Sequence, residues 1–381
     1  MIPYNRQKIS NQDIRSVVKV LKSNFITQGK KVVEFEKKLS IYCGAKFAVA
    51  VNSATSALHI ACMSIGLKEN DFLWTVPNTF VASSNCALYC GAKVDFVDID
   101  PVTNNISVKE LNNKLKNAKV KNKLPKILVI VHFGGNPCDL EKIKNLSKKY
   151  KFRIIEDASH ALGAVYKNDK IGSCKYSDIT VFSFHPVKSI TTAEGGSALT
   201  NNQKLFDKMS MLRTHGITKD RKQFKDKRNN EPWYFEQQLL GYNYRMNEIE
   251  ATLGISQLKA LNGFIKKRTD VAKIYDAHLK DLPLILPSTI PNSKSSFHLY
   301  TIRFKKGDRK KIFNQLRKSK IGVNVHYIPV VLHPFYKKLG FNLKNFPSCL
   351  AFYKNSMSIP IFPDLKKKTQ LIIIKCIKKL I

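Results

Sequence analysis

The sequence predicts an α/β protein with a mainly parallel sheet and a smaller α+β region toward its C-terminal end. Over the first 200 residues, short apolar segments alternate with segments of helical periodicity, which is typical of a parallel sheet covered on both faces. Prolines at 283, 287 and 291 then interrupt the chain, and strands and helices mix after them. We therefore expect a large domain over residues 1–262 and a small domain over 263–381.

Short apolar runs mark the expected strands, and periodic runs bounded by polar residues or glycine mark the expected helices. The strands expected in the large domain are 47–51, 72–76, 94–97, 127–131, 153–156, 180–184 and 196–200. The helices expected between them are 54–66, 79–89, 107–116 and 139–150. Ligands of open parallel sheets bind beyond the carboxyl ends of the strands, so residues that follow strands are candidates for a site.

The pattern becomes more varied after residue 200. The charged stretch 218–231 is expected to be an exposed loop, and helical periodicity follows over 247–261 and 264–279. In the small domain we expect strands at 298–304 and 321–326 and helices at 308–319 and 364–380.

The net charge of +37 raises the question of a nucleic-acid partner. Of the 65 basic residues, 54 are Lys and 11 are Arg, whereas recognition of bases and phosphates favours Arg. Lys, Asn and Ile also have A/T-rich codons, so genome composition explains the bias. We therefore expect no nucleic-acid partner, but a solvated basic surface that attracts anions.

The longest apolar runs are far shorter than the roughly 20 residues that a membrane helix needs. The N-terminal segment lacks the apolar stretch of a signal peptide, so we expect a cytoplasmic protein without a membrane partner. The eight cysteines include no C-x-x-C pair, so we expect reduced thiols and no metal site.

Small and hydroxyl-bearing residues follow the first expected strand, in the run Asn52-Ser-Ala-Thr-Ser-Ala57. At the N-terminus of a helix, free backbone N–H groups and the helix dipole favour a phosphate. An ordinary Ser or Thr N-cap explains the same residues. The run alone does not decide between the two interpretations.

The strand at 153–156 ends in Glu156-Asp157-Ala-Ser-His160, which brings a carboxylate and an imidazole to the edge of the sheet. Asp157 as a helix cap and His160 as a core residue are the structural alternatives. The strand at 180–184 leads to Lys188, in a segment that is otherwise apolar. Burial would lower the pKa of Lys188, as a Schiff-base lysine requires.

The three strand ends together indicate one kind of site. A phosphate cradle, a carboxylate for a pyridine nitrogen and a lysine for an aldehyde are what pyridoxal 5′-phosphate (PLP) needs. The pair Gly195-Gly196 lets the backbone pass close to a bound group.

Several motifs resemble the DegT/StrS-type sugar aminotransferases, which are PLP-dependent transferases of fold type I. The resemblance extends from about Tyr4 to the C-terminus and is strongest to the UDP-sugar 4-aminotransferases of pseudaminic acid biosynthesis. The motifs are Asn52-Ser-Ala-Thr-Ser-Ala57, Pro77-x-x-Phe80, Glu156-Asp157-Ala-x-His160, Phe182-Ser-Phe-His-x-x-Lys188, Glu194-Gly-Gly196, Gly241-x-Asn243-x-Arg245 and Ile26-Thr-Gln-Gly29.

The resemblance implies a role for each candidate cofactor residue. Lys188 is the catalytic lysine, and Asp157 keeps the pyridine nitrogen protonated. Phe80 stacks on the ring, and His160 lies near the ring hydroxyl. The phosphate is held by Ala54, Thr55 and Ser183, and by Asn243 of the other subunit of a homodimer.

The resemblance also implies a UDP-sugar acceptor and L-glutamate as amino donor. The sugar-nucleotide pocket would be lined by Tyr4, Asn24, Phe25, Ile26, Thr27, Asn324, Val325, His326 and Tyr327. Pro186 and the loop His132-Phe-Gly-Gly135 depart from the family pattern, which leaves the choice of sugar open. An aminotransferase for another keto sugar is the main alternative. A related sugar dehydratase would have His in place of Lys188.

Overall fold

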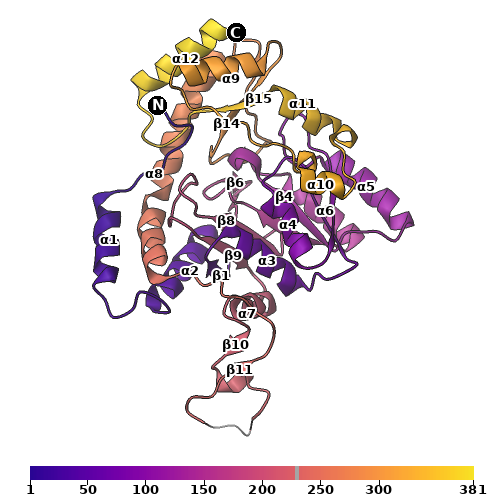
Figure 1. Cartoon of the computed structure of the whole chain (residues 1–381), viewed down its shortest axis with the longest axis vertical. Coiled ribbons are helices and arrows are strands. Elements are labelled where there is room, and N and C mark those ends of the chain that lie inside the picture. The colour runs from indigo at the N-terminus through magenta and orange to yellow at the C-terminus, as the bar shows by residue number, and fades with distance from the viewer. Residues whose placement is uncertain (228–230) are drawn as a thin grey trace.

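The computed structural model describes residues 1–227 and 231–381, and its centre is a seven-stranded sheet of order β1-β9-β8-β5-β4-β2-β3 (Figure 1). Only β9 runs antiparallel to its neighbours, so the mainly parallel sheet that the sequence predicts is confirmed. The strands are β1 (Phe47–Val51), β2 (Phe72–Thr75), β3 (Lys93–Phe96), β4 (Ile127–Val131), β5 (Arg153–Asp157), β8 (Ile179–Ser183) and β9 (Gly196–Thr200).

Helices cover both faces of this sheet, and every residue of β4 is buried. The continuous apolar run of β4 is what a strand buried on both faces needs. The covering helices that the sequence predicts are α3 (Ala54–Ile65), α4 (Ala82–Tyr89), α5 (Val108–Val120) and α6 (Leu140–Tyr150), and α7 (Gln203–Leu212) follows β9.

Two N-terminal helices, α1 (Asn11–Leu21) and α2 (Lys30–Cys43), were not expected from the sequence. The N-cap residue of α2 is Gly29, which has no side chain to satisfy the first N–H groups. Glu248 does so instead, accepting from the backbone N–H of Lys31 at 2.7 Å and of Val32 at 3.2 Å. A Cβ at Gly29 would lie 2.5 Å from Oε2 of Glu248, so a larger residue there would displace the carboxylate.

The two helices expected over 247–261 and 264–279 are one continuous helix, α8 (Glu248–Leu279). Asn247 and Glu250 form a capping box at its start. Gly263 does not break the helix, and a Cβ there would meet nothing within 4 Å. The first half of α8 packs in the main core and the second half in a separate small core. The domain boundary between residues 262 and 263 stays a prediction, and these residues lie within α8.

The small core is built around the sheet β12-β14-β15 and two helices, at the upper end of Figure 1. No strand forms at 321–326 within the described chain, so that expectation was wrong. The segment makes only single bridges, from Ile321 to Ile2 and from Asn324 to Ser358, because it crosses between two neighbours rather than following one. The elements of the small core are β12 (Leu284–Ile285), β14 (Tyr300–Phe304), β15 (Ser356–Ile359), α9 (Arg309–Lys318) and α12 (Lys367–Leu380). The helices α10 (Pro334–Lys338) and α11 (Pro347–Asn355) pack on the main core instead.

The expected exposed loop belongs to an arm that projects from the body beyond α7 (Figure 1). The arm contains the short pair β10 (Ile217–Thr218) and β11 (Glu236–Gln237), and Trp233 on it is 76% exposed. Residues 228–230 of the expected loop lie outside the described residues. A further small sheet joins β6 (Val165–Tyr166), β7 (Asp169–Lys170) and β13 (Ser293–Lys294).

Among the residues described, no helix has the length and apolar character needed to cross a membrane.

Candidate active site

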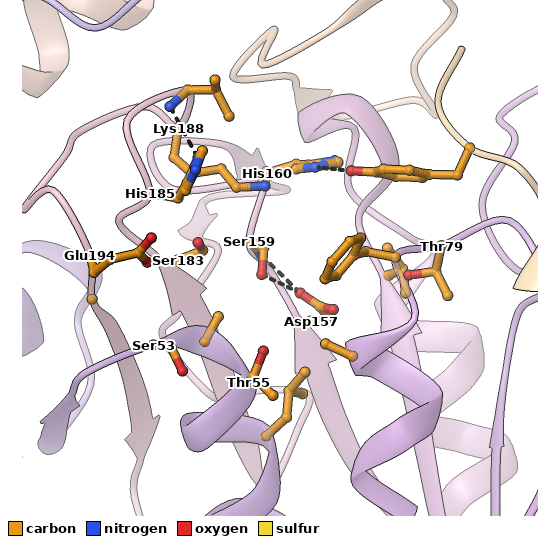
Figure 2. A pocket seen from close by; sticks show the side chains of 18 residues that line it. Ser53, Thr55, Thr79, Asp157, Ser159, His160, Ser183, His185, Lys188 and Glu194 are labelled. Atoms are coloured by element: carbon orange, nitrogen blue, oxygen red, sulfur yellow. Dashed lines mark hydrogen bonds between the residues drawn. The ribbon is translucent and has the colours of Figure 1, made fainter. Parts of the chain in front are cut away.

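A pocket of about 300 Å³ opens at the carboxyl edge of the central sheet, a volume typical of sites for small molecules (Figure 2). The ends of β1, β5 and β8 and the start of the antiparallel β9 meet at this edge. The structure brings together these residues predicted from the sequence: Ala54, Thr55, Phe80, Asp157, His160, Ser183, Lys188 and Tyr327.

One end of the pocket is the N-terminus of α3. Ser53 is the N-cap, and its hydroxyl accepts from the N–H of Ser56 at 3.1 Å, so the capping interpretation holds. Within the described chain no hydrogen bond uses the N–H groups of Ala54 and Thr55, which remain available to a ligand. Gly196 makes room for this turn, because a Cβ there would lie 2.4 Å from the backbone of Ala54. The start of α3 therefore has both features: Ser53 caps the helix, and the N–H groups of Ala54 and Thr55 can still bind an anion.

The floor of the pocket holds Asp157, a buried carboxylate fixed by three hydrogen bonds. Ser83 donates to Oδ2 at 2.6 Å, and Ser159 donates to Oδ1 from its hydroxyl at 2.6 Å and from its N–H at 3.1 Å. The Thr79 hydroxyl lies 2.8 Å from that of Ser83. Since Ser83 donates to Asp157, Thr79 is the donor to Ser83. These hydrogen bonds therefore fix the orientation of the Asp157 carboxylate in the pocket.

Lys188 extends its side chain into the pocket above Asp157 and Ser159 (Figure 2). Burial lowers the pKa of Lys188 from the ordinary 10.5 to about 8, and the nearby negative charge of Asp157 opposes part of this change. A substantial fraction of the amine is thus neutral near pH 8, and a neutral amine can act as a nucleophile or as a base.

His160 also lines the pocket (Figure 2), and its Nε2 lies 2.9 Å from Oη of Tyr327. The other ring nitrogen, Nδ1, accepts from the N–H of Gly134 at 3.3 Å. Burial, together with the positive charge of Lys188, holds the pKa of His160 well below its ordinary value. The ring is therefore neutral at physiological pH.

Other predicted residues lie outside this pocket in a single chain. Tyr4, Asn324, Val325 and His326 do not line it. The ring of Tyr4 is 5.3 Å from that of His326, which is itself 5.1 Å from the ring of Tyr327. Asn243 is exposed, and its backbone pairs with Thr214 at the base of the arm.

The segment Asn24, Phe25, Ile26 and Thr27 is exposed between α1 and α2 and does not reach the pocket of its own chain. The carbonyl of Ile26 accepts from the N–H of Glu248 at 3.0 Å, so the segment is tied to the start of α8. Asn243 lies five residues before Glu248. Asn243 and the segment 24–27 are therefore both held near the start of α8, in one region of the surface.

Several lining residues were missed from the sequence. Ser159 could have been found, because a Ser two residues after an Asp commonly donates back to that carboxylate. Thr79 lines the pocket and contacts Ser83, which in turn donates to Asp157. Neither residue gave such a signal, since the contact of Ser83 with Asp157 depends on the order of the strands. The other lining residues not predicted as site residues are Ser53, Leu58, Ala82, Val131, His185, Val187 and Glu194.

Comparisons with known proteins agree with this geometry. Residues 7–378 match the model of the DegT/DnrJ/EryC1/StrS aminotransferase family. The chain is 42% identical over 372 residues to the UDP-4-amino-4,6-dideoxy-N-acetyl-beta-L-altrosamine transaminase of Campylobacter jejuni, covering 97% of this chain and 94% of the relative.

Two solved structures share the whole fold. Helicobacter pylori PseC, described as an aminotransferase involved in the biosynthesis of pseudoaminic acid, has a TM-score of 0.90 and 33% identity, covering 100% of this chain and 98% of that one. The PLP form of the putative sugar aminotransferase Spr1654 from Streptococcus pneumoniae has a TM-score of 0.90 and 29% identity, covering 100% of this chain and 98% of that one.

Proposed function

Because the chain belongs to the DegT/DnrJ/EryC1/StrS aminotransferase family and is a PLP-dependent sugar aminotransferase, we propose that it aminates C4 of a UDP-linked 4-keto sugar. The acceptor we propose is a UDP-linked 2-acetamido-2,6-dideoxy-4-ketohexose, with L-glutamate as donor. The product would be a 4-amino sugar on the way to pseudaminic acid.

The pocket fits PLP in three respects. The unused N–H groups of Ala54 and Thr55 suit a phosphate, and the hydroxyl of Ser183 lines the same end. The buried carboxylate of Asp157 suits a protonated pyridine nitrogen. The amine of Lys188 suits an aldehyde, because its pKa is lowered. PLP supplies an electron sink that lets a C–H bond next to nitrogen lose its proton.

The roles proposed for the chain's own residues follow from their surroundings. Lys188 Nζ moves the proton at the reacting carbon, and its lowered pKa suits a base that must also return the proton. Asp157 is held in place by its serine donors. Phe80 borders the pocket with its ring 6.3 Å from that of Tyr327, which supports a role in covering a flat ligand.

The observation that carries the choice of acceptor is the likeness to three relatives named as transaminases of the same UDP-altrosamine compound. They are 42%, 42% and 35% identical to this chain and matched over at least 95% of it. A sugar site that reads hydroxyl and acetamide groups by hydrogen bonds discriminates between epimers, because the wrong epimer leaves polar groups unpaired.

We also propose a homodimer with sites shared between subunits. Asn243 and the segment 24–27 lie outside their own chain's pocket, yet both are anchored around the start of α8. A twofold-symmetric dimer would carry both elements to the neighbour's pocket together. Tyr4 and residues 324–326, which adjoin Tyr327 through the rings of Tyr4 and His326, would complete the sugar side.

The proposed function is tested by supplying purified enzyme with L-glutamate and a panel of 4-keto nucleotide sugars, and measuring release of 2-oxoglutarate. We expect the UDP-linked ketosugar of L-arabino configuration to be the best acceptor. The C5 epimer of D-xylo configuration should show kcat/KM lower by on the order of tenfold or more. Equal or better turnover of the D-xylo epimer would assign the protein to a different keto sugar.

A further inference from the structure

The hydrogen bonds around His160 fix which of its nitrogens carries the proton. A backbone N–H can only donate, so Nδ1 of His160 must be the acceptor for Gly134. A neutral imidazole has one N–H group, which must then be at Nε2. The Nε2–H group therefore donates to the hydroxyl oxygen of Tyr327, 2.9 Å away.

The opposite arrangement would place two donors against each other. If His160 carried a proton on Nδ1, that N–H would face the N–H of Gly134 at 3.3 Å. Gly134 cannot easily turn away, because its carbonyl accepts from the N–H of Leu299 at 3.2 Å. The next residue, Gly135, is packed against the backbone of His160 and against Ser296. The loop that departs from the family pattern is thus the part that orients His160.

The hydroxyl of Tyr327 then keeps its own hydrogen free. It accepts from His160, and no other hydrogen bond of this hydroxyl is present in the described parts of the chain. Burial raises the pKa of Tyr327, so the hydroxyl remains protonated. Tyr327 lines the same pocket as Asp157 and Lys188. The hydroxyl hydrogen of Tyr327 is therefore available to donate to a molecule that binds in the pocket.

We propose that Tyr327 is a hydrogen-bond donor in this pocket, to an oxygen atom of the bound cofactor or sugar, and that His160 is a positioning residue that acts through Tyr327. The chain of donors runs from the N–H of Gly134 to His160 and then to Tyr327. His160 in this arrangement neither accepts nor releases a proton during turnover. The inference does not depend on which sugar is the acceptor.

The tautomer is tested directly by NMR on protein with ¹⁵N-labelled histidines, with and without PLP. The signal of His160 is identified by its loss in His160→Gln. We expect a neutral ring protonated at Nε2 from pH 6 to pH 8 in both samples. A ring protonated at Nδ1, or at both nitrogens, overturns the proposal without any measurement of activity.

Substitutions separate positioning from acid–base chemistry. In His160→Gln the amide NH₂ can still donate to Tyr327 while the amide oxygen accepts from Gly134, so most of the activity and the PLP absorption spectrum should be retained. His160→Leu removes both bonds and should lower kcat/KM by about tenfold or more. Equal damage by Gln and Leu would contradict a positioning role.

Tyr327→Phe identifies the source of the acceptor oxygen. A shifted PLP spectrum and a PLP affinity lower by about three- to tenfold indicate an oxygen of the cofactor. An unchanged spectrum with KM for the sugar raised by a similar factor indicates an oxygen of the substrate. If neither changes, Tyr327 is not a donor in the pocket. The matched control is Tyr336→Phe, whose buried hydroxyl contacts Ser84 and Asn85 away from the pocket.

Discussion

The hydroxyl of Ser83 lies 2.6 Å from Oδ2 of Asp157, although 74 residues separate the two in sequence. Ser83 is in α4, which follows β2, whereas Asp157 ends β5. In the sheet, β4 lies between β2 and β5, and all three strands are parallel. The contact exists because the carboxyl ends of β2 and β5 therefore lie at the same edge of the sheet. A residue of one helix thereby orients the carboxylate on which the PLP site depends.

Ser83→Ala should therefore weaken the site without removing it. Asp157 keeps two bonds from Ser159 but loses one bond to its charged oxygen, and such bonds contribute about 1.5–3 kcal/mol. We expect a lower affinity for PLP and a lower kcat, measured by fluorescence titration and steady-state kinetics. Ser84→Ala is the control, because the Ser84 hydroxyl contacts Tyr336 instead. Equal loss of PLP affinity in both variants would mean a general packing effect.

The amine of Lys188 should titrate at lower pH than ordinary lysines. Trace acetylation of PLP-free protein, followed by mass spectrometry, should give Lys188 a midpoint near its pKa of about 8, against about 10.4 for lysines in peptides. Only the neutral amine reacts, so the rate should rise with pH through this midpoint.

Asp157→Asn should lower the Lys188 midpoint further, because the charge of Asp157 favours the protonated amine. Turnover in this variant should fall by on the order of a hundredfold or more, since a neutral amide no longer stabilises a protonated pyridine nitrogen. A midpoint that moves upward would show that Asp157 and Lys188 do not interact as described.

Glu248 should matter for stability through the start of α2. Glu248→Ala leaves the N–H groups of Lys31 and Val32 without their acceptor, a loss comparable to removing an N-cap, about 1–2 kcal/mol. Gly29→Ala should also destabilise the chain, because its Cβ would collide with the carboxylate. Thermal denaturation of both single variants and of the double variant tests this.

The double variant tests more specifically whether Gly29 and Glu248 interact. Glu248→Ala removes the group with which the new methyl collides, so Gly29→Ala should cost less in that background than in the wild type. Additive losses would mean that Gly29 and Glu248 act independently.

Mixed dimers test the shared sites. Lys188→Ala and Asn243→Ala chains, each inactive alone, should regain part of the activity when mixed, because one site of the heterodimer then carries neither defect. If heterodimers form and nothing is regained, Asn243 acts within its own chain.

The strands and the pocket residues at their ends were predictable because each is signalled locally, as with Asp157 after an apolar run and Lys188 in an apolar segment. Contacts such as Ser83 to Asp157 were not, because they depend on strand order. The sequence predicted separate helices over 247–261 and 264–279, but nothing crowds Gly263 between them, and packing on both sides continues α8. The segment 321–326 has strand-like residues, yet no neighbouring strand runs along it.

The most direct test of the account is to load the protein with PLP, reduce it with borohydride and map the modified peptide. We expect a single PLP-bearing peptide that contains Lys188, and no stable adduct in Lys188→Ala. The flanking Phe184-His-Pro-Val187 sequence makes this peptide easy to identify. An adduct on any other lysine in the wild-type protein would contradict the placement of the site.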